Sequence, residues 1–334
     1  MFILGIECTA HTFGIGIVSD TGKILANVID SYTSPEAGMI PNKVAEHHET
    51  VAEKILNESF RVAKLSWEDI SFIAYSAGPG LDPALWAGYR KAKEWSDRYG
   101  KKLVGVNHPA AHLSIGKMIH KLKDPCYLYV SGVNTQVIVQ DTEKDGERGK
   151  MKENRETRKN GKYRVLGETL DNGLGNMLDK FGRLLGLGFP AGAKIEELAK
   201  KGKYIELPYA VKGMDVSFSG ILTKVEQLFK QGKATKEDLC FSLQETCFAM
   251  MTEVAERAMA HTDKKELLLV GGVGANQRFC EMLEIMCKER GAQFFKVPSE
   301  LVRDNGVMIA WEGFLRKEEP GDVEVKVHWR IDEV

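Results

Sequence analysis

Two histidines four residues apart are the residues of this sequence best suited to binding a metal ion. His108 and His112 stand in the segment NHPAAHLSIGK, where Pro109 suits the first turn of a helix. Residues four apart share one face of a helix, so both imidazole rings can reach one cation. No glutamate follows the first histidine, which excludes the HExxH pattern of zinc proteases. The spacing suits a metal site, although such a pair alone is more often a structural or surface coincidence.

The elements that must position these histidines occur twice along the chain. Each half begins with a three-strand meander, starting at 2–7 and at 127–131, and continues with an amphipathic helix, at 44–65 and at 173–186. Each half then predicts two more strands, each followed by a helix. These strands lie at 72–80 and 102–107 in the first half, and at 267–276 and 292–297 in the second.

This repeated order predicts a duplicated α/β protein with the actin-like ATPase fold. We expect two lobes, 1–122 and 123–334, with a central cleft between them. Ligands of such sheets bind at the carboxyl ends of the strands, so the cleft is the expected site.

A carboxylate in the second half completes the predicted metal site. Asp304, in RDNGVMIAW, follows the last strand of its half as the two histidines follow the last strand of theirs. Pseudo-symmetry would then place Asp304 opposite His108 and His112 across the cleft, giving two histidines and one carboxylate with open positions for substrate. Tyr129 could add a phenolate ligand or be a core aromatic residue. The adjacent His47 and His48 diverge by about 100° on a helix, so we assign them to its surface.

Two loops have the composition of a phosphate and nucleotide cradle. The turn Ser131, Gly132, Val133, Asn134 and Thr135 can present successive backbone N–H groups to an anion, although an ordinary hairpin uses the same residues. The segment 271–276 closes an apolar strand and opens a helix, where Asn276 could bond an adenosine. The equivalent places of the two loops in the repeat favour a nucleotide-binding cleft.

Composition limits the classes of protein and partner. The 334 residues, 43% of them hydrophobic, suffice for two cores, and 46 basic against 47 acidic residues give a net charge of −1. Such a balance does not indicate a nucleic-acid or membrane partner, so a polyanion would need a local basic patch. The N-terminus has no signal-peptide pattern, and we expect an intracellular protein. The six cysteines form no CxxC pair and are expected to be reduced, buried thiols.

Many segments in order resemble one known family. They are LGIECTAHTFGIGIV, GPGLDPAL, GVNHPAAH, LYVSGVNTQVI, LGETLD, LPYAVKGMDVSFSGIL, DLCFSLQET, ERAMAHT, LVGGVGANQR, RDNGVMIAW and RIDEV. Together they resemble the universal tRNA threonylcarbamoyladenosine transferase family in its archaeal and eukaryotic form, the catalytic subunit of the KEOPS complex. Older names for relatives, O-sialoglycoprotein endopeptidase and glycoprotease, find no support in these residues.

The resemblance implies a reaction, a cofactor and partners. The reaction is transfer of the threonylcarbamoyl group of threonylcarbamoyl-AMP to N6 of adenosine 37 in ANN-decoding tRNAs, with release of AMP. The cofactor is one divalent metal ion, iron or zinc before magnesium, and nucleotides of the ATP or AMP type could also bind the cleft. Implied partners are tRNA, a small atypical kinase, a regulatory subunit and a dimerising subunit, with no membrane. The implied location is the cytoplasm, and also the nucleus in a eukaryote.

The resemblance also assigns roles to residues. Glu7, His108, His112 and Asp304 form the implied catalytic centre, and Tyr129 joins the metal ligands. Implied substrate contacts are Tyr129, Val130, Ser131, Gly132, Val133 and Asn134 on the acyl-phosphate side, and Asp179, Gly192, Glu196 and Asn276 at the ribose and base.

Some positions depart from the family pattern. Val133, Cys8 and Ala191 stand where glycine is usual, and Asp82 also differs. If position 133 required positive φ, a valine there would cost about 1–3 kcal/mol. A second hypothesis is therefore a nucleotide-binding scaffold of the same complex with weak or no activity, and a third is a sugar kinase or chaperone-type ATPase. The long polar loop 141–162 is expected to be a solvated hairpin tip or a contact for tRNA phosphates.

Overall fold

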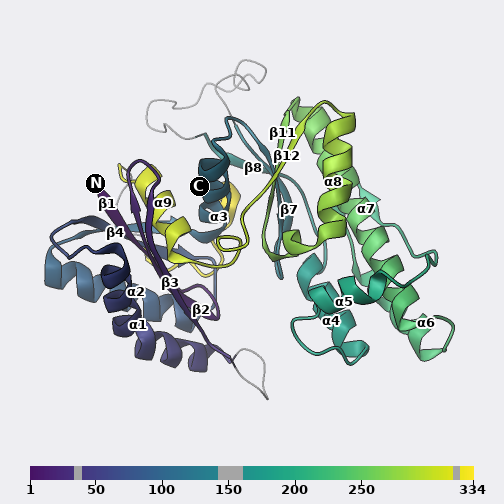
Figure 1. The fold of residues 1–334 in the computed structure, drawn as a ribbon, viewed down its shortest axis with the longest axis horizontal. Helices are drawn as coiled ribbons and strands as arrows, with labels where there is room; N and C mark the ends of the chain where they lie inside the picture. The colour runs from purple at the N-terminus through teal and green to yellow at the C-terminus, as the bar shows by residue number, and fades with distance from the viewer. Residues whose placement is uncertain (34–39, 142–160, 319–323) are drawn as a thin grey trace. The chain divides into compact units, whose positions relative to one another are not determined.

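The computed structural model folds into two compact α/β units (Figure 1). It describes residues 1–33, 40–141, 161–318 and 324–334. Unit 1 consists of Met1–Lys121 together with Glu300–Val334, and unit 2 is Leu122–Ser299. Most of the predicted hairpin tip at 141–162 lies outside the described residues.

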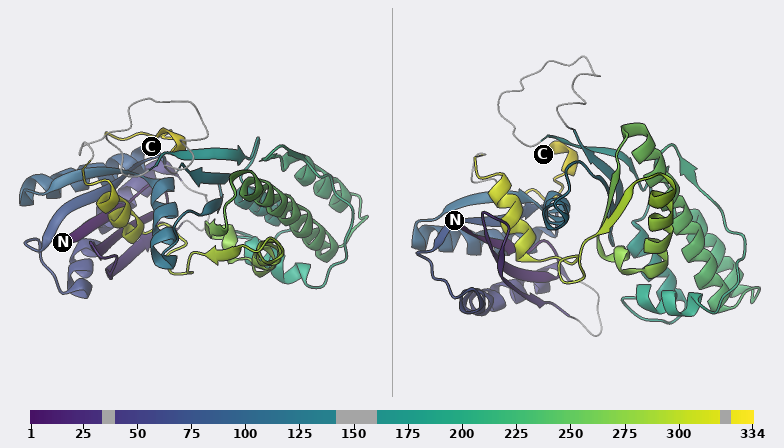
Figure 2. Two further views of the ribbon diagram at one scale, coloured as in Figure 1. Left: turned by 90° about the horizontal axis from the view of Figure 1, so that it is seen from above. Right: turned by 45° about the horizontal axis from the view of Figure 1, so that its top comes forward.

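Unit 1 is built on a five-stranded sheet in the order β3-β2-β1-β4-β5. Its strands are β1 (Phe2–Glu7), β2 (Thr12–Ser19), β3 (Ile24–Ser31), β4 (Ile70–Gly78) and β5 (Lys102–Asn107). The first three form an antiparallel meander, whereas β4 runs parallel to β1 and β5 parallel to β4. The helices are α1 (Pro41–Ala63), α2 (Asp82–Tyr99), α3 (His108–His120) and α9 (Gly306–Leu315). Helices α1 and α2 pack together on the sheet, and α9 packs on β1, β2 and α3 (Figure 2).

Glycines allow the backbone of α9 to approach the sheet very closely. A Cβ atom added to Gly16 would lie 2.2 Å from the Val307 nitrogen, and one added to Gly5 would lie 2.2 Å from the Gly306 carbonyl oxygen. Since side chains essentially never tolerate such contacts, these strand positions require glycine. The contact fixes the start of α9, and with it Asp304, against the sheet of unit 1.

Unit 2 repeats the sheet with the same connectivity, in the order β12-β11-β6-β7-β8. Its strands are β6 (Cys126–Val130), β7 (Thr135–Gln140), β8 (Tyr163–Glu168), β11 (Glu266–Val270) and β12 (Gln293–Lys296). A two-stranded hairpin joins β9 (Val211–Lys212) and β10 (Asp215–Val216). The helices are α4 (Leu174–Leu184), α5 (Gly192–Ala199), α6 (Ser219–Lys230), α7 (Lys236–Thr262) and α8 (Gln277–Glu289). Their apolar faces form one core with β6, β7 and β11.

The internal duplication predicted from the sequence is confirmed by the matching strand orders of the two sheets. The first half follows the predicted order, but the second carries α5, α6, α7 and the β9–β10 hairpin as additions between β8 and β11. A second difference concerns 300–334, which we assigned to the second lobe. These residues pack in unit 1, because the glycines of β1 and β2 receive α9 there.

The structure confirms the prediction for the cysteines and contradicts the one for His48. The six cysteines are free and buried, as expected. The assignment of His48 to a helix surface is wrong, because α1 packs on β2 and turns this residue inward, where it is fully buried. In the part of the chain that the structure describes, no helix is long and apolar enough to cross a membrane.

Candidate metal centre and nucleotide cradle

Helix α3 holds both predicted histidine ligands on one face. The Asn107 side chain caps its N-terminus by accepting a hydrogen bond from the Ala110 N–H at 3.0 Å, and Pro109 occupies the first turn, where its missing N–H costs nothing. The helix therefore begins at His108, with His112 one turn later. His108 and His112 are 8% and 3% exposed, and their ring centroids lie 4.6 Å apart.

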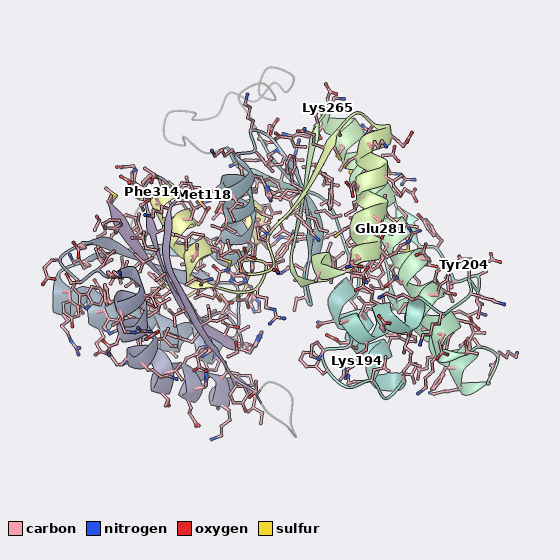
Figure 3. All side chains as sticks on the ribbon, viewed as in Figure 1. Met118, Lys194, Tyr204, Lys265, Glu281 and Phe314 are labelled. Atoms are coloured by element: carbon pink, nitrogen blue, oxygen red, sulfur yellow. The ribbon has the colours of Figure 1, made fainter. Side chains whose placement is uncertain are left out.

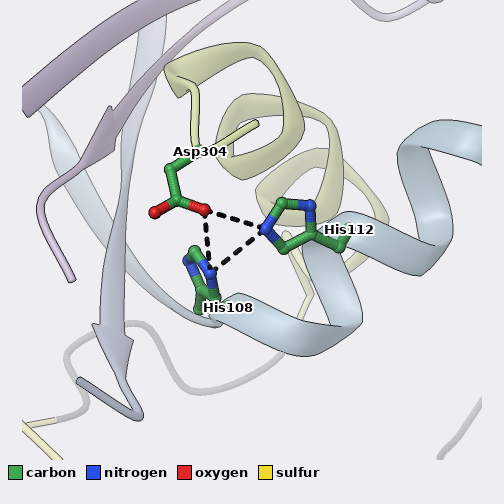
Figure 4. A group of neighbouring side chains, drawn as sticks. All are labelled: His108, His112 and Asp304. Carbon is green, nitrogen blue, oxygen red and sulfur yellow. Dashed lines mark hydrogen bonds and ion pairs between the residues drawn. The ribbon is translucent and has the colours of Figure 1, made fainter. Parts of the chain in front are cut away.

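Asp304 joins the two histidines within unit 1 (Figure 4). It immediately precedes Asn305, whose side chain caps α9 by accepting from the Met308 N–H at 3.1 Å. The Asp304 side chain is 22% exposed, so solvent reaches the cluster from its side. Asp304 therefore lies beside the two histidines as predicted, but it belongs to the same unit rather than to the opposite lobe.

The donor atoms of the triad have the spacing of ligands to one ion. His112 Nε2 lies 3.1 Å from His108 Nε2 and 3.2 Å from Asp304 Oδ1, and His108 Nε2 lies 3.5 Å from the same oxygen. Donors about 2.0–2.2 Å from a metal stand about 3.0–3.5 Å apart at neighbouring coordination positions. The three atoms therefore fit a single cation on one side, with the remaining positions open, as in two-histidine, one-carboxylate sites.

Glu7 lies behind His108 and selects which of its nitrogens can bind a metal. Its Oε2 lies 2.9 Å from His108 Nδ1, while its Oε1 accepts from the N–H and hydroxyl of Thr9 at 2.8 and 2.5 Å. A carboxylate only accepts, so in the neutral ring Nδ1 holds the proton and Nε2 presents its lone pair to the triad. Glu7 is fully buried and is not one of the three clustered ligands.

The charges around the triad determine its protonation. Burial opposes a charged His108, but the negative charges of Glu7 and Asp304 outweigh burial and raise the pKa of His108 to about 9. Burial lowers the pKa of His112. For Asp304, burial opposes ionisation, yet the charge of His108 and the hydrogen bond of His112 hold its pKa below the ordinary value. Without metal at neutral pH, His108 therefore carries a second proton, on Nε2, and a metal ion must displace this proton to bind.

Unit 2 contains the predicted phosphate loop. The turn between β6 and β7 is closed by the Ser131 N–H donating to the Asn134 carbonyl at 2.7 Å. Among the described residues, none accepts a hydrogen bond from the amides of Gly132 or Val133, which leaves two donors for an anion. Tyr129 and Val130 end β6 beneath this turn, both buried, and the Tyr129 hydroxyl lies 3.5 Å from Asn134 Nδ2. Whether Tyr129 binds a metal stays a prediction.

Val133 is accommodated without backbone strain. The non-glycine residues with positive φ in the described ranges are Lys64, Lys121 and Asp263, and Val133 is not among them. Its side chain is 72% exposed. The conformational penalty considered for this valine therefore does not arise.

The other departures are also accommodated. The Cys8 side chain points into the core, with Sγ 3.3 Å from Ser76 Oγ, and the absence of a side chain at Gly88 makes room for it. Ala191 packs against Gly182 in the same way. Asp82 opens α2, where its negative charge favours the helix N-terminus.

The residues predicted to contact ribose and base lie on α4, α5 and the start of α8. Asp179 Oδ1 accepts from the Ala191 N–H at 2.8 Å, which places α4 beside Gly192, the first residue of α5. Glu196 Oε1 accepts from the Gln277 N–H at 2.8 Å. Each carboxylate keeps a second oxygen for a further hydrogen bond.

A pocket of about 230 Å³ opens beside Glu196. Its lining includes Gln244, Arg278 and Glu281 from α7 and α8, and Glu281 is labelled in Figure 3. Gln244 Oε1 accepts from Asn276 Nδ2 at 2.8 Å, so Asn276 both caps α8 and contacts α7. Sequence reasoning missed Gln244, because nothing in the pattern of the long helix α7 distinguishes it from its neighbours.

Comparison with known proteins identifies the family. The model of the tRNA N6-adenosine threonylcarbamoyltransferase family matches residues 23–153 and 148–311. The Thermococcus kodakarensis protein of that name is 50% identical over 341 residues, covering 100% of this chain and 98% of the relative. The chain belongs to the tRNA N6-adenosine threonylcarbamoyltransferase family. It is therefore an enzyme of the transferase class, and the family resemblance noted in the sequence is confirmed.

A second relative of this threonylcarbamoyltransferase family member and one solved structure of similar fold extend the comparison. A probable bifunctional tRNA threonylcarbamoyladenosine biosynthesis protein of Methanocaldococcus jannaschii is 45% identical over 316 residues, covering 94% of this chain but 55% of the relative. The solved structure of HypF from T. kodakarensis superposes with a TM-score of 0.63 at 16% identity, covering 95% of this chain and 48% of HypF. This second likeness concerns the fold alone, and the predicted actin-like ATPase fold is confirmed.

Proposed function

We propose that this chain transfers the threonylcarbamoyl group of threonylcarbamoyl-AMP to N6 of adenosine 37 in ANN-decoding tRNAs, releasing AMP. Membership of the family supports tRNA threonylcarbamoyladenosine synthesis in general. The observation that carries the finer proposal is the spacing of His108, His112 and Asp304, whose donor atoms fit one metal ion with open positions.

The proposed metal is iron or zinc, because imidazole and carboxylate ligands suit both. When bound, it would stabilise negative charge on an oxygen of the acyl or phosphate group. His108 Nε2, His112 Nε2 and Asp304 would hold it, with Tyr129 as a proposed further ligand. Glu7 would keep the His108 proton on Nδ1, away from the metal, through their 2.9 Å contact.

The nucleotide part of the substrate is proposed to bind unit 2. The amides of Gly132 and Val133 can donate to phosphate oxygens, and the remaining oxygens of Asp179 and Glu196 can accept from ribose hydroxyls. The pocket beside Glu196 offers space for a base. These donors and acceptors match the chemistry of an acyl-adenylate.

Partners follow from the same family assignment. We propose that the chain acts on tRNA together with a small atypical kinase, a regulatory subunit and a dimerising subunit, as in a KEOPS complex. The M. jannaschii relative is named as bifunctional, and this chain matches only 55% of its length. The remaining part of that relative supports the proposal that this chain works with a second protein. The cytoplasmic location stays a prediction.

The alternative is a catalytically weakened scaffold, and the reason to consider it is the valine at position 133, where glycine is usual. The ordinary backbone at Val133 removes the conformational reason for inactivity. The test is single-turnover transfer from labelled threonylcarbamoyl-AMP to an ANN-decoding tRNA with partner subunits present. We expect His108→Ala to abolish transfer and Asp97→Asn, an exposed change on α2, to leave it intact. Absence of transfer until Val133→Gly restores it would instead support the scaffold.

A further inference from the structure

A chain of hydrogen bonds connects helix α1 to the turn that supports the metal centre. His48 Nε2 lies 2.9 Å from the Ala10 carbonyl oxygen, His47 Nδ1 lies 3.3 Å from His48 Nδ1, and His47 Nε2 lies 3.0 Å from Asp30 Oδ1. These hydrogen bonds therefore lead from β3 through two adjacent histidines to the turn between β1 and β2. We refer to Asp30, His47, His48 and Ala10 as the histidine chain.

The two ends of the histidine chain fix its proton count. A carbonyl oxygen and a carboxylate only accept, so His48 Nε2 and His47 Nε2 must both carry protons. The Nδ1···Nδ1 contact needs one more proton between its two nitrogens. Three protons on two imidazoles mean that one ring is the imidazolium cation.

The surroundings decide which ring carries the charge. His48 is fully buried and packs against the Phe13 ring, and burial lowers its pKa to about 4. The His47 side chain is 18% exposed and contacts the Asp30 carboxylate directly. The imidazolium therefore belongs to His47, and His48 is the neutral Nε2–H tautomer.

Other charged and titratable groups face the histidine chain from neighbouring elements. Lys54, about two helical turns after His47 on α1, lies 3.6 Å from the second Asp30 oxygen. Tyr32 presents its ring to His47 with centroids 6.0 Å apart. From the β1–β2 side, the charge of Glu7 raises the pKa of His48 and that of His11 lowers it.

The turn reached by the histidine chain orients the metal centre. Thr9 precedes Ala10, and its N–H and hydroxyl donate to Glu7, which in turn contacts His108 Nδ1. Thr9 Oγ1 also lies 3.2 Å from His108 Nδ1. A shift of the Ala10 carbonyl therefore moves the groups that select the ligand nitrogen of His108.

We propose that His47, as an imidazolium, and His48, as a neutral Nε2–H imidazole, are positioning residues that hold the Thr9–Glu7 support of the metal centre. The link to catalysis rests on the proposed function, whereas the protonation pattern and its effect on metal affinity do not.

The first test is nitrogen NMR of the full chain labelled with ¹⁵N-histidine at pH 7, without metal and with Zn²⁺. The expected result is two protonated ring nitrogens on His47, and on His48 a protonated Nε2 with a bare Nδ1. A neutral His47 at pH 7 overturns the proposal.

The second test perturbs the carboxylate at the end of the histidine chain. Asp30→Asn keeps the size but removes the charge, and it should weaken the hydrogen bond that His47 Nε2 donates at this end of the histidine chain. Zn²⁺ affinity at pH 7 should fall with it. Glu58→Gln is the matched control, since it removes one carboxylate charge away from the histidine chain. Glu58 lies on α1, where it pairs with Arg61. Equal Zn²⁺ affinities for Asp30→Asn and Glu58→Gln contradict the proposed role.

The third test separates hydrogen bonding from packing. His48→Gln still offers one donor and one acceptor, whereas His48→Leu offers neither. Zn²⁺ affinity should stay within about threefold for glutamine and fall about tenfold or more for leucine. Equal losses in the two variants overturn the positioning role. These measurements need no tRNA, so failure of transfer with the expected NMR and affinity results counts against the proposed function alone.

Discussion

Replacing Glu7 with glutamine should reverse the proton position on His108. Glu7 Oε1 accepts two hydrogen bonds from Thr9, so the glutamine carbonyl should keep that place. The amide nitrogen then takes the place of Oε2, 2.9 Å from His108 Nδ1, and donates to it. The proton of neutral His108 must then sit on Nε2, the atom that faces His112 and Asp304.

The size of the effect depends on pH, because two consequences oppose each other. With a His108 pKa of about 9, proton competition at pH 7 weakens metal binding by about 100-fold in the wild-type chain. The glutamine variant loses the Glu7 charge and most of that competition. Loss of the supporting carboxylate itself costs about 10–100-fold in metal affinity. The two chains should therefore bind similarly near pH 7, and the variant more weakly by about 10–100-fold near pH 9.

Chelator-buffered Zn²⁺ titrations across pH 6.5–9, combined with calorimetry in buffers of different ionisation enthalpy, measure both effects. The wild-type chain should release about one proton per metal ion at pH 7, and Glu7→Gln clearly less. Glu58→Gln, an exposed change on α1, should behave like wild type. Equal proton release and equal affinity near pH 9 in wild type and Glu7→Gln would refute the role given to Glu7.

Three further predictions concern packing, the phosphate loop and pH. Gly16→Ala should push the Val307 backbone off the sheet, lower stability by about 1–3 kcal/mol and weaken metal binding, whereas Gly220→Ala, with open space around it, should do neither in denaturant and Zn²⁺ titrations. Val133→Gly should change AMP affinity less than about twofold by calorimetry, because Val133 is exposed and its backbone is unstrained, so its removal releases no strain. A gain above tenfold, equivalent to about 1.4 kcal/mol, contradicts this. The raised pKa of His108 means that its stabilising protonation is complete below about pH 6.5 and is lost as pH rises toward about 9. The Tm of the metal-free chain should therefore fall over this range more than that of His108→Gln, and parallel curves would contradict the assignment.

The sequence predicted the repeated sheet because strand and helix periodicities are local properties. The residues that follow predicted strands, such as His108 after β5 and Ser131 after β6, can therefore be located from the sequence. The additional helices α5 to α7 were not predicted, since the repeat gives no template for insertions in one half.

The arrangement of the metal centre depended on tertiary contacts that periodicity does not encode. Asp304 was expected across a cleft, but glycines at positions 5 and 16 receive α9 in unit 1. Glycines inside strands are a signal of close backbone approach, and could have suggested this. The burial of His48 could not be predicted, because which of two adjacent helix positions faces inward depends on how α1 packs on the sheet.

The most direct test of the central claim is a titration of metal-free chain with Zn²⁺ or Fe²⁺, followed by single-turnover transfer of the threonylcarbamoyl group to tRNA with partner subunits present. Transfer should rise with added metal and saturate at about one ion per chain, and Asp304→Asn should need more metal to reach the same rate. Full transfer by chain kept in excess chelator, with no response to added metal, would contradict it.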